Sequence, residues 1–141
     1  MRKYVLSVFS LAILAIALTL ACGSSTPTYM LQSVNLSPTA ADAQGAPVQF
    51  TATGYFNLQP SPEQLFSANW GVCYQNLPTT AVSVSSSGLA RCAAGSVGTY
   101  TVWAWAERAG SCGGNNGEDP ANLCGGASEC QVTGTAQLTC P

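Results

Sequence analysis

The stretch Val48-Gln49-Phe50-Thr51-Ala52-Thr53 alternates apolar and polar side chains at every position. A period of two is typical of a β-strand that buries one face and turns the other to solvent. The sequence Ala43-Gln44-Gly45-Ala46-Pro47 before it favours a turn, and the prolines within 57–63 indicate a loop after it. We therefore expect a half-buried strand at 48–53.

Similar short apolar or alternating runs recur along the chain, separated by segments rich in Gly, Pro and Ser. The longest run is 99–106, and the glycine-rich segment 110–128 shows no period and is expected to be a loop. Strands of this length and spacing predict an all-β domain, an antiparallel β-sandwich of about seven strands, with one sheet closed on itself as the alternative. The expected strands are 31–36, 48–53, 66–73, 81–84, 89–92, 99–106 and 131–140.

Several short motifs follow one another through this domain. They are Val34-Asn35-Leu36-Ser37-Pro38, Gly45 to Gly54, Trp70, Val82 to Leu89, Gly98-Thr99-Tyr100-Thr101-Val102 and Thr133 to Thr139. Their order and spacing resemble those of bacterial immunoglobulin-like domains of group 2, which occur in surface and adhesion proteins. The resemblance implies an immunoglobulin-like domain over 31–141 with a binding or adhesion role. Six cysteines and the long 110–128 segment depart from the family pattern.

Tyr100 is a candidate for a tyrosine corner, because it lies two residues before Val102, which we expect to be buried. In such a corner the tyrosine hydroxyl bonds back to the backbone a few residues upstream. Inward-facing side chains from two facing sheets would fill a core about 10 Å thick. Disulfides are expected to supplement this small core, each by about 2–4 kcal/mol.

The first 21 residues have the organisation of an export signal. Met1-Arg2-Lys3 is positively charged, and the segment from Tyr4 to Ala21 is almost wholly apolar. These features predict a cleaved signal peptide at residues 1–21. The alternatives are an ordinary secretory signal cut nearby and an uncleaved transmembrane segment, although about 18 apolar residues only just span a bilayer.

The residues around Ala21 and Cys22 resemble the lipobox of bacterial lipoproteins, with Thr19 as the departure from the pattern. The resemblance implies cleavage after Ala21 and lipidation of Cys22, which would anchor the chain in membrane lipid. Gly23 after the cysteine resembles sorting to the outer membrane, so we expect the protein at its periplasmic face or at the cell surface. The small polar residues that begin segment 22–30 are typical of a flexible tether.

The chain has seven cysteines, an odd number that needs an explanation in an exported protein. Lipidation would consume Cys22 and leave six, enough for three disulfides in an oxidising compartment. Six cysteines can pair in many ways, and their spacing does not select among them. The six are Cys73, Cys92, Cys112, Cys124, Cys130 and Cys140.

Two of these pairings are local. Cys112 and Cys124 flank a Gly- and Asn-rich segment, so they are candidates for a local disulfide. Cys130 and Cys140 would lie about 33 Å apart on one straight strand, so they can pair only if the chain bends, with Gly134 as the candidate for the bend. A metal site is the rival interpretation, but the chain has no histidine and no Cys-x-x-Cys motif. We expect neither a metal nor another cofactor.

Trp103 and Trp105 alternate with smaller apolar residues from Val102 to Ala106 on the longest expected strand. If the smaller side chains face the core, both indoles face outward and could stack on sugar rings as a ligand platform. The alternative is that segment 107–128, held by its disulfides, lies over both indoles and buries them.

Catalytic and ion-binding groups are scarce in this sequence. Without its first 21 residues the chain keeps two arginines, no lysine and six carboxylates, so no serine has a basic partner and a nucleic-acid partner is excluded. Glu107 with Glu118, Asp119 or Glu129 could form a carboxylate pair, but so small a domain offers little cleft. The oxygen-rich segment 115–119 does not have the spacing of an EF-hand, and we expect a solvated turn. We therefore expect no enzyme.

Two functional hypotheses follow. In the first, the protein is a lipid-anchored, immunoglobulin-like module of the cell envelope that binds a protein or glycan ligand. In the second, it is a purely structural envelope lipoprotein, a spacer without a specific ligand. A small enzyme or inhibitor is a third, weaker alternative. Ligand binding through Trp103 and Trp105 would separate the first two.

Overall fold

A computed structural model of the protein describes residues 27–108, 124 and 131–141. Their regular structure is β-strand, and no helix among them has the length and apolarity needed to cross a membrane. The expected signal peptide, Cys22 and, apart from Cys124, the expected loop lie outside the described residues. The strands are β1 (Leu31–Ser37), β2 (Ala40–Asp42), β3 (Val48–Gln49), β4 (Thr51–Phe56), β5 (Glu63–Gln64), β6 (Asn69–Tyr74), β7 (Leu77–Pro78), β8 (Val82–Val84), β9 (Leu89–Cys92), β10 (Gly98–Glu107) and β11 (Gln131–Cys140).

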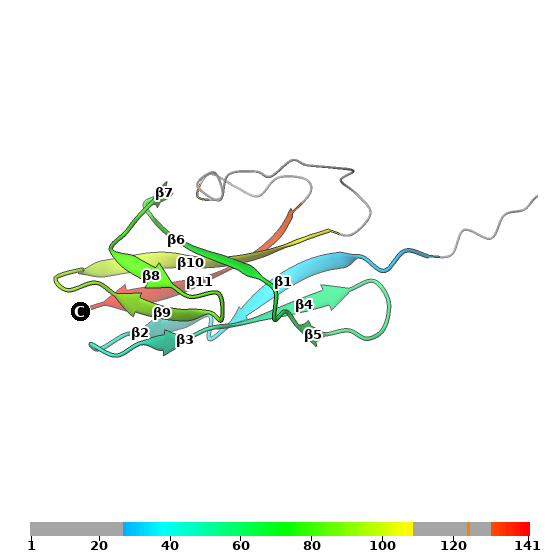
Figure 1. The fold of residues 1–141 in the computed structure, drawn as a ribbon, viewed down its shortest axis with the longest axis horizontal. Helices are drawn as coiled ribbons and strands as arrows, with labels where there is room; N and C mark the ends of the chain where they lie inside the picture. The colour runs from blue at the N-terminus through cyan, green and yellow to red at the C-terminus, as the bar shows by residue number, and fades with distance from the viewer. Residues whose placement is uncertain (1–26, 109–123, 125–130) are drawn as a thin grey trace, which may run out of the picture.

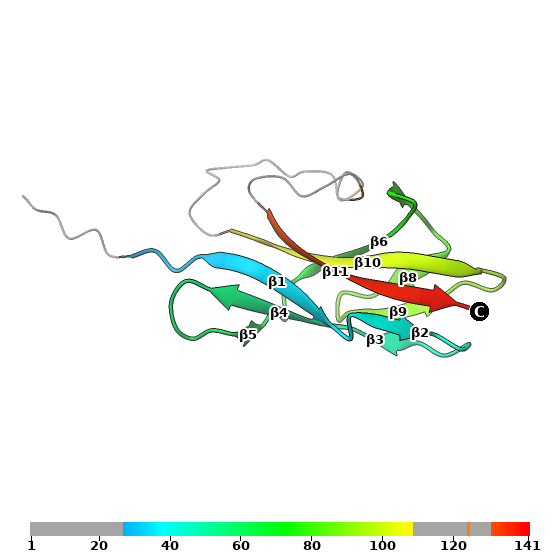
Figure 2. The same ribbon diagram turned by 180° about the vertical axis from the view of Figure 1, so that it is seen from behind.

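The strands form three sheets, none of which closes on itself. One has five strands in the order β2–β11–β10–β6–β7, and the others have the orders β1–β4–β5 and β3–β9–β8. Every pair is antiparallel except β2 and β11, which run parallel. The two small sheets lie against the large one, β1 on β11 and β10, and β8 on β6 (Figures 1 and 2).

The core lies between the small sheets and one face of the large sheet. From Tyr100 onward on β10, and along β11, the even-numbered residues face this core, and the expected burial of Val102 is confirmed. Phe50, Val102 and Leu138 are the largest side chains that are fully buried. Burial of such side chains stabilises the fold by about 1.5–3 kcal/mol each.

The strand expected at 48–53 is interrupted at Phe50. Its first part, β3, pairs with β9, and its second part, β4, pairs with β1. Between them the Phe50 amide donates a 2.9 Å hydrogen bond to the carbonyl of Gly88 in the turn that precedes β9. One alternating run therefore crosses from one small sheet to the other, and the buried Phe50 ring marks the crossing point.

Gly134 has a different role from the one expected from the sequence. Strand β11 runs in unbroken register with β10 from Gln131 to Cys140, so the chain does not bend at Gly134. A side chain at Gly134 would overlap the carbonyl oxygen of Val34 and the side chain of Leu36. The glycine therefore permits the close approach of β1 to the inner face of β11.

Candidate functional site

The first disulfide, Cys92–Cys140, joins β9 to β11 and so ties a small sheet to the large one. The two Cα atoms are 5.9 Å apart and 48 residues apart in sequence. The pairing of Cys140 with Cys130, which the sequence left open if the chain bends, is wrong because Cys140 is bonded to Cys92 on the core side of β11.

The second disulfide, Cys73–Cys124, lies on the opposite face of the large sheet. It links β6 to the connection between β10 and β11, with a Cα–Cα distance of 5.6 Å across 51 residues. The local pair Cys112–Cys124 is therefore wrong, because Cys124 reaches across to β6 rather than back along its own segment. Cys112 and Cys130 lie outside the described residues. Two disulfides in so small a domain indicate an oxidising environment outside the cytoplasm.

The outer face of β10 carries Trp103 and Trp105, on the side away from the core as predicted. Trp103 is only 4% exposed, and Trp105 is half-buried. Both indoles pack against the Cys73–Cys124 disulfide. The Trp103 ring lies over Gly71 of the neighbouring strand, where a side chain would overlap the indole. A ligand platform would need both indoles uncovered, and it stays a prediction.

Several buried polar atoms cluster around these indoles. Trp105 stands opposite Thr133 in the strand register, and Gln131 lies two residues before Thr133. Within the part of the chain that the structure describes, four buried atoms on this face have no hydrogen-bond partner: Trp103 Nε1, Trp105 Nε1, Gln131 Oε1 and Thr133 Oγ1. Buried polar atoms normally have partners. This face therefore differs chemically from the apolar inner face.

Tyr100 forms the hydrogen bond expected of a tyrosine corner. Its hydroxyl donates to the carbonyl of Val97, 3.2 Å away and three residues upstream. The Tyr100 ring is buried and packs against Tyr74, with 5.1 Å between ring centroids. Around it, Leu77 and Val97 are 67% and 65% exposed. The turn before β10 is thus held from inside by the buried Tyr100 ring, while apolar side chains near it are exposed.

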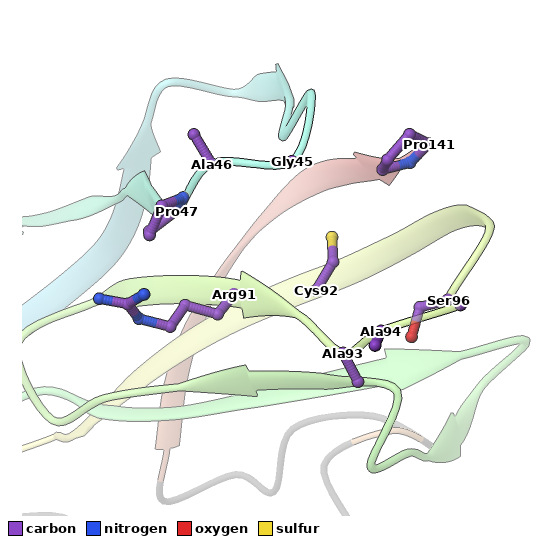
Figure 3. A pocket seen from close by; sticks show the side chains of 10 residues that line it. Gly45, Ala46, Pro47, Arg91, Cys92, Ala93, Ala94, Ser96 and Pro141 are labelled. Atoms are coloured by element: carbon purple, nitrogen blue, oxygen red, sulfur yellow. The ribbon is translucent and has the colours of Figure 1, made fainter.

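An open hollow of about 390 Å³ lies at the end of the domain that carries the C-terminus. Figure 3 shows it between the turn Gly45–Pro47, the end of β9 with Arg91 and Cys92, and Pro141. Most of its lining residues are small and uncharged, and among the described residues that line it Arg91 has the one charged side chain. A guanidinium at such a site can donate paired hydrogen bonds to a carboxylate or a phosphate. No local pattern singles out Arg91, because residues 45–47 and Pro141, which complete the hollow, are distant from it in sequence.

A third group of contacts joins residues 28–30 to the loop between β4 and β5. The Tyr29 ring stacks on Phe56, with ring centroids 4.4 Å apart. The Tyr29 hydroxyl donates to the carbonyl of Pro60 at 2.7 Å and lies 3.3 Å from Glu63 Oε2. The Asn57 side chain holds the same segment, as its Nδ2 donates to the carbonyl of Thr28 at 2.9 Å and its Oδ1 accepts the amide of Met30 at 2.8 Å. We call these contacts of residues 28–30 with residues 56–63 the N-terminal clasp.

Desolvation, followed by the negative charge of Glu63 and the hydrogen bond to it, raises the pKa of Tyr29 above its usual value. A raised pKa means that the protonated phenol is favoured in the folded state. The contribution of the phenol to stability is therefore complete below the usual pKa of tyrosine and is lost as the pH rises through the raised value. At neutral pH the hydroxyl remains a donor.

No group of three or more metal-ligating side chains occurs among the described residues. The oxygen-rich segment 115–119 lies outside those residues, as do three of the four carboxylates considered for a catalytic pair. The fourth, Glu107, ends β10 with its side chain exposed.

Neither a protein-family model nor a curated protein sequence matches the chain significantly. By itself the structure establishes a small all-β domain of several mostly antiparallel sheets, held by two disulfides.

Proposed function

We propose that the protein is an exported, lipid-anchored module of the cell envelope, built on an immunoglobulin-like β-sandwich and used for binding or adhesion. The observation that carries the proposal is the pair of disulfides, Cys73–Cys124 and Cys92–Cys140, which belongs to an oxidising compartment. These bonds use four of the seven cysteines and leave an odd number. Cys22, which follows the predicted signal peptide, is the cysteine that lipidation would consume.

The strand order supports the immunoglobulin-like assignment. If β1 is strand A, β3 with β4 strand B, and β6, β8, β9, β10 and β11 strands C to G, the pairing gives sheets A–B–E–D and C–F–G. These are the two sheets of an immunoglobulin constant-type domain. Trp70 then lies on strand C against the core, and Tyr100 at the start of strand F bonds back upstream. Both features are typical of immunoglobulin domains.

The end of the domain opposite the tether supports a binding role. Tyr74, Leu77 and Val97 expose apolar surface in the β6–β7 hairpin and in the turn before β10, and the hollow beside Arg91 lies at the same end. Exposed apolar side chains beside a polar group are typical of protein or glycan contact surfaces. The burial of Trp103 favours the second candidate, a structural spacer without a ligand, because it removes one indole from the surface.

An intact mass of the protein extracted from membranes tests the anchor. We expect the mass of residues 22–141 plus two or three acyl chains, with no cysteine open to alkylation before reduction. The matched control is Cys22→Ser, which should lose the lipid and keep every disulfide. A mass that still includes residues 1–21, or six freely alkylated cysteines, would contradict the proposal.

Glycan and protein arrays probed with the lipid-free domain separate the binding module from the spacer. Specific binding that weakens in Trp105→Ala would assign the ligand to the outer face of β10. Binding that weakens in Arg91→Ala would assign it to the hollow. An absence of binding by the wild-type domain on every array favours the spacer.

A further inference from the structure

The N-terminal clasp lies where the folded domain meets the segment that leads back to Cys22. Five hydrogen bonds and one ring stack hold residues 28–30. They include the Asn57 amide, which donates to the carbonyl of Met30 at 3.1 Å. Of these, only the bond from the backbone N–H of Asn57 joins two backbone groups. Thr28 and Tyr29 are therefore held by side chains and not by the strand pairing of β1. The clasp therefore holds three residues, 28–30, that precede the first residue of β1, Leu31.

The clasp limits how far the domain can stand from residue 22. An extended chain covers at most about 3.3–3.6 Å per residue. The path from Cys22 to Thr28 is therefore no longer than about 20 Å, whatever conformation it takes. Without the clasp, the first residue held by strand pairing is Leu31, and the limit rises to about 30 Å.

The clasp also lies at the end of the domain where the chain enters β1, which is the end close to residue 22. Figures 1 and 2 show residues 27–30 leaving one end of the long axis, beside the β4–β5 loop, and the C-terminus at the opposite end. Strand β10 runs from Gly98 at the C-terminal end to Glu107 at the clasp end. The hollow beside Arg91 therefore lies far from the clasp.

We infer that the N-terminal clasp sets the working length of the tether, and holds the β4–β5 loop end of the domain close to a lipid surface while the Arg91 end faces away from it. This inference rests on the proposed lipidation of Cys22. The surface in question is a bilayer that receives the acyl chains of Cys22. The clasp shortens the tether because it holds up to three residues, 28–30, that would otherwise belong to the tether.

The three tryptophans allow this height to be measured without an added label. In the strand register Trp103 stands opposite Gly71, Trp105 opposite Asn69, and Trp70 opposite Ala104, so all three lie at one level of the sheet. On β10 that level is nearer to Glu107, at the clasp end of the strand, than to Gly98. Energy transfer from these indoles to a dansyl dye on lipid headgroups reports the distance between this level and the bilayer.

The experiment uses the full lipidated protein in vesicles of phosphatidylethanolamine and phosphatidylglycerol that carry dansyl-phosphatidylethanolamine. The clasp variant is Tyr29→Ala/Asn57→Ala, which removes the stack and the side-chain bonds and frees about two residues. The matched control inserts Gly-Ser after Gly23, which lengthens the tether equally and leaves the clasp intact. Thermal unfolding of each protein verifies that the domain is folded.

We expect both variants to lose energy transfer by a similar amount, because each adds about 7 Å of reach. Lower transfer in the insertion variant alone would show that the clasp does not restrict the tether, and would overturn the inference. Equal transfer in all three proteins would overturn it as well, because tether length would then not set the height. A chain that carries no lipid by mass would instead refute the proposed function, so the two failures are distinguishable.

Discussion

Both faces of β10 carry buried side chains, but for different reasons. On the inner face Tyr100, Val102 and Ala104 pack into a continuous apolar core formed by all three sheets. On the outer face Trp103 and Trp105 pack against a single disulfide, in a cluster that includes buried polar atoms without partners among the described residues. The inner face depends on the alternating pattern of the sequence. The outer face depends on one covalent bond between distant segments.

The largest expected effect comes from a cavity on the inner face. Leu138 of β11 is fully buried, and Leu138→Ala should lower the free energy of unfolding by about 2–5 kcal/mol, because lost burial adds to an unfilled cavity. The matched control is Thr139→Ala, whose side chain is exposed on the other face and should change stability by less than about 0.5 kcal/mol. Guanidinium unfolding measures both. Similar losses for the two variants would contradict the assignment of the faces.

Removal of the outer disulfide is the second test. Cys73→Ala/Cys124→Ala should cost about 2–4 kcal/mol, and so should Cys92→Ala/Cys140→Ala, because the two bonds close loops of similar length. The two variants should differ in acrylamide quenching of tryptophan fluorescence. Only loss of Cys73–Cys124 removes the contact that covers Trp103. If quenching in the native state rises equally in both variants, the disulfide is not what separates the two faces.

The inner face could be predicted from the sequence, but the packing of the outer face on a disulfide could not. The sequence of 99–106 and 131–140 predicted both long strands, and in 99–106 it also predicted that Val102 faces the core, because a strand places alternate side chains on one side. The strands β2, β5 and β7 were missed, since two or three residues show no period. Neither disulfide pairing could be derived, because each joins residues about 50 positions apart through the folded geometry.

Candidate sites followed the same division. The hydrogen bond of Tyr100 could be expected because it is local: it joins residues three positions apart near the start of a predicted strand. The N-terminal clasp had no signal in the sequence. Tyr29 and Asn57 are separated by 28 residues in the chain and meet only because β1 pairs with β4. The contact of Trp103 with the Cys73–Cys124 disulfide likewise forms only because Cys124 reaches β6, which no local pattern indicates.

A smaller effect is expected at Gly71, which lies beneath the Trp103 ring on the outer face. Gly71→Ala places a methyl group where the indole lies, so either the ring or the strand must shift, at about 1–3 kcal/mol. Because Trp103 is displaced, its fluorescence should also become more sensitive to acrylamide. The double variant Gly71→Ala/Trp103→Leu tests the origin of the cost, since the smaller side chain should recover part of the stability. If it recovers none, the contact between the ring and Gly71 is not what requires the glycine.

The smallest expected effect is at Tyr100, whose hydroxyl makes a hydrogen bond at one end of the inner face. Tyr100→Phe keeps the buried ring and its packing against Tyr74 but removes the hydroxyl that donates to Val97. A net intramolecular hydrogen bond contributes about 0.5–1.5 kcal/mol, so a loss near 1 kcal/mol is expected. Tyr55→Phe is the control, because Tyr55 lies on β4 with its side chain exposed. Amide exchange adds a local readout: if the bond stabilises the turn before β10, exchange in residues 96–99 should accelerate in Tyr100→Phe and stay unchanged in Tyr55→Phe. Unchanged stability and exchange in both variants would mean that the ring alone, through its apolar packing, holds this end of the inner face.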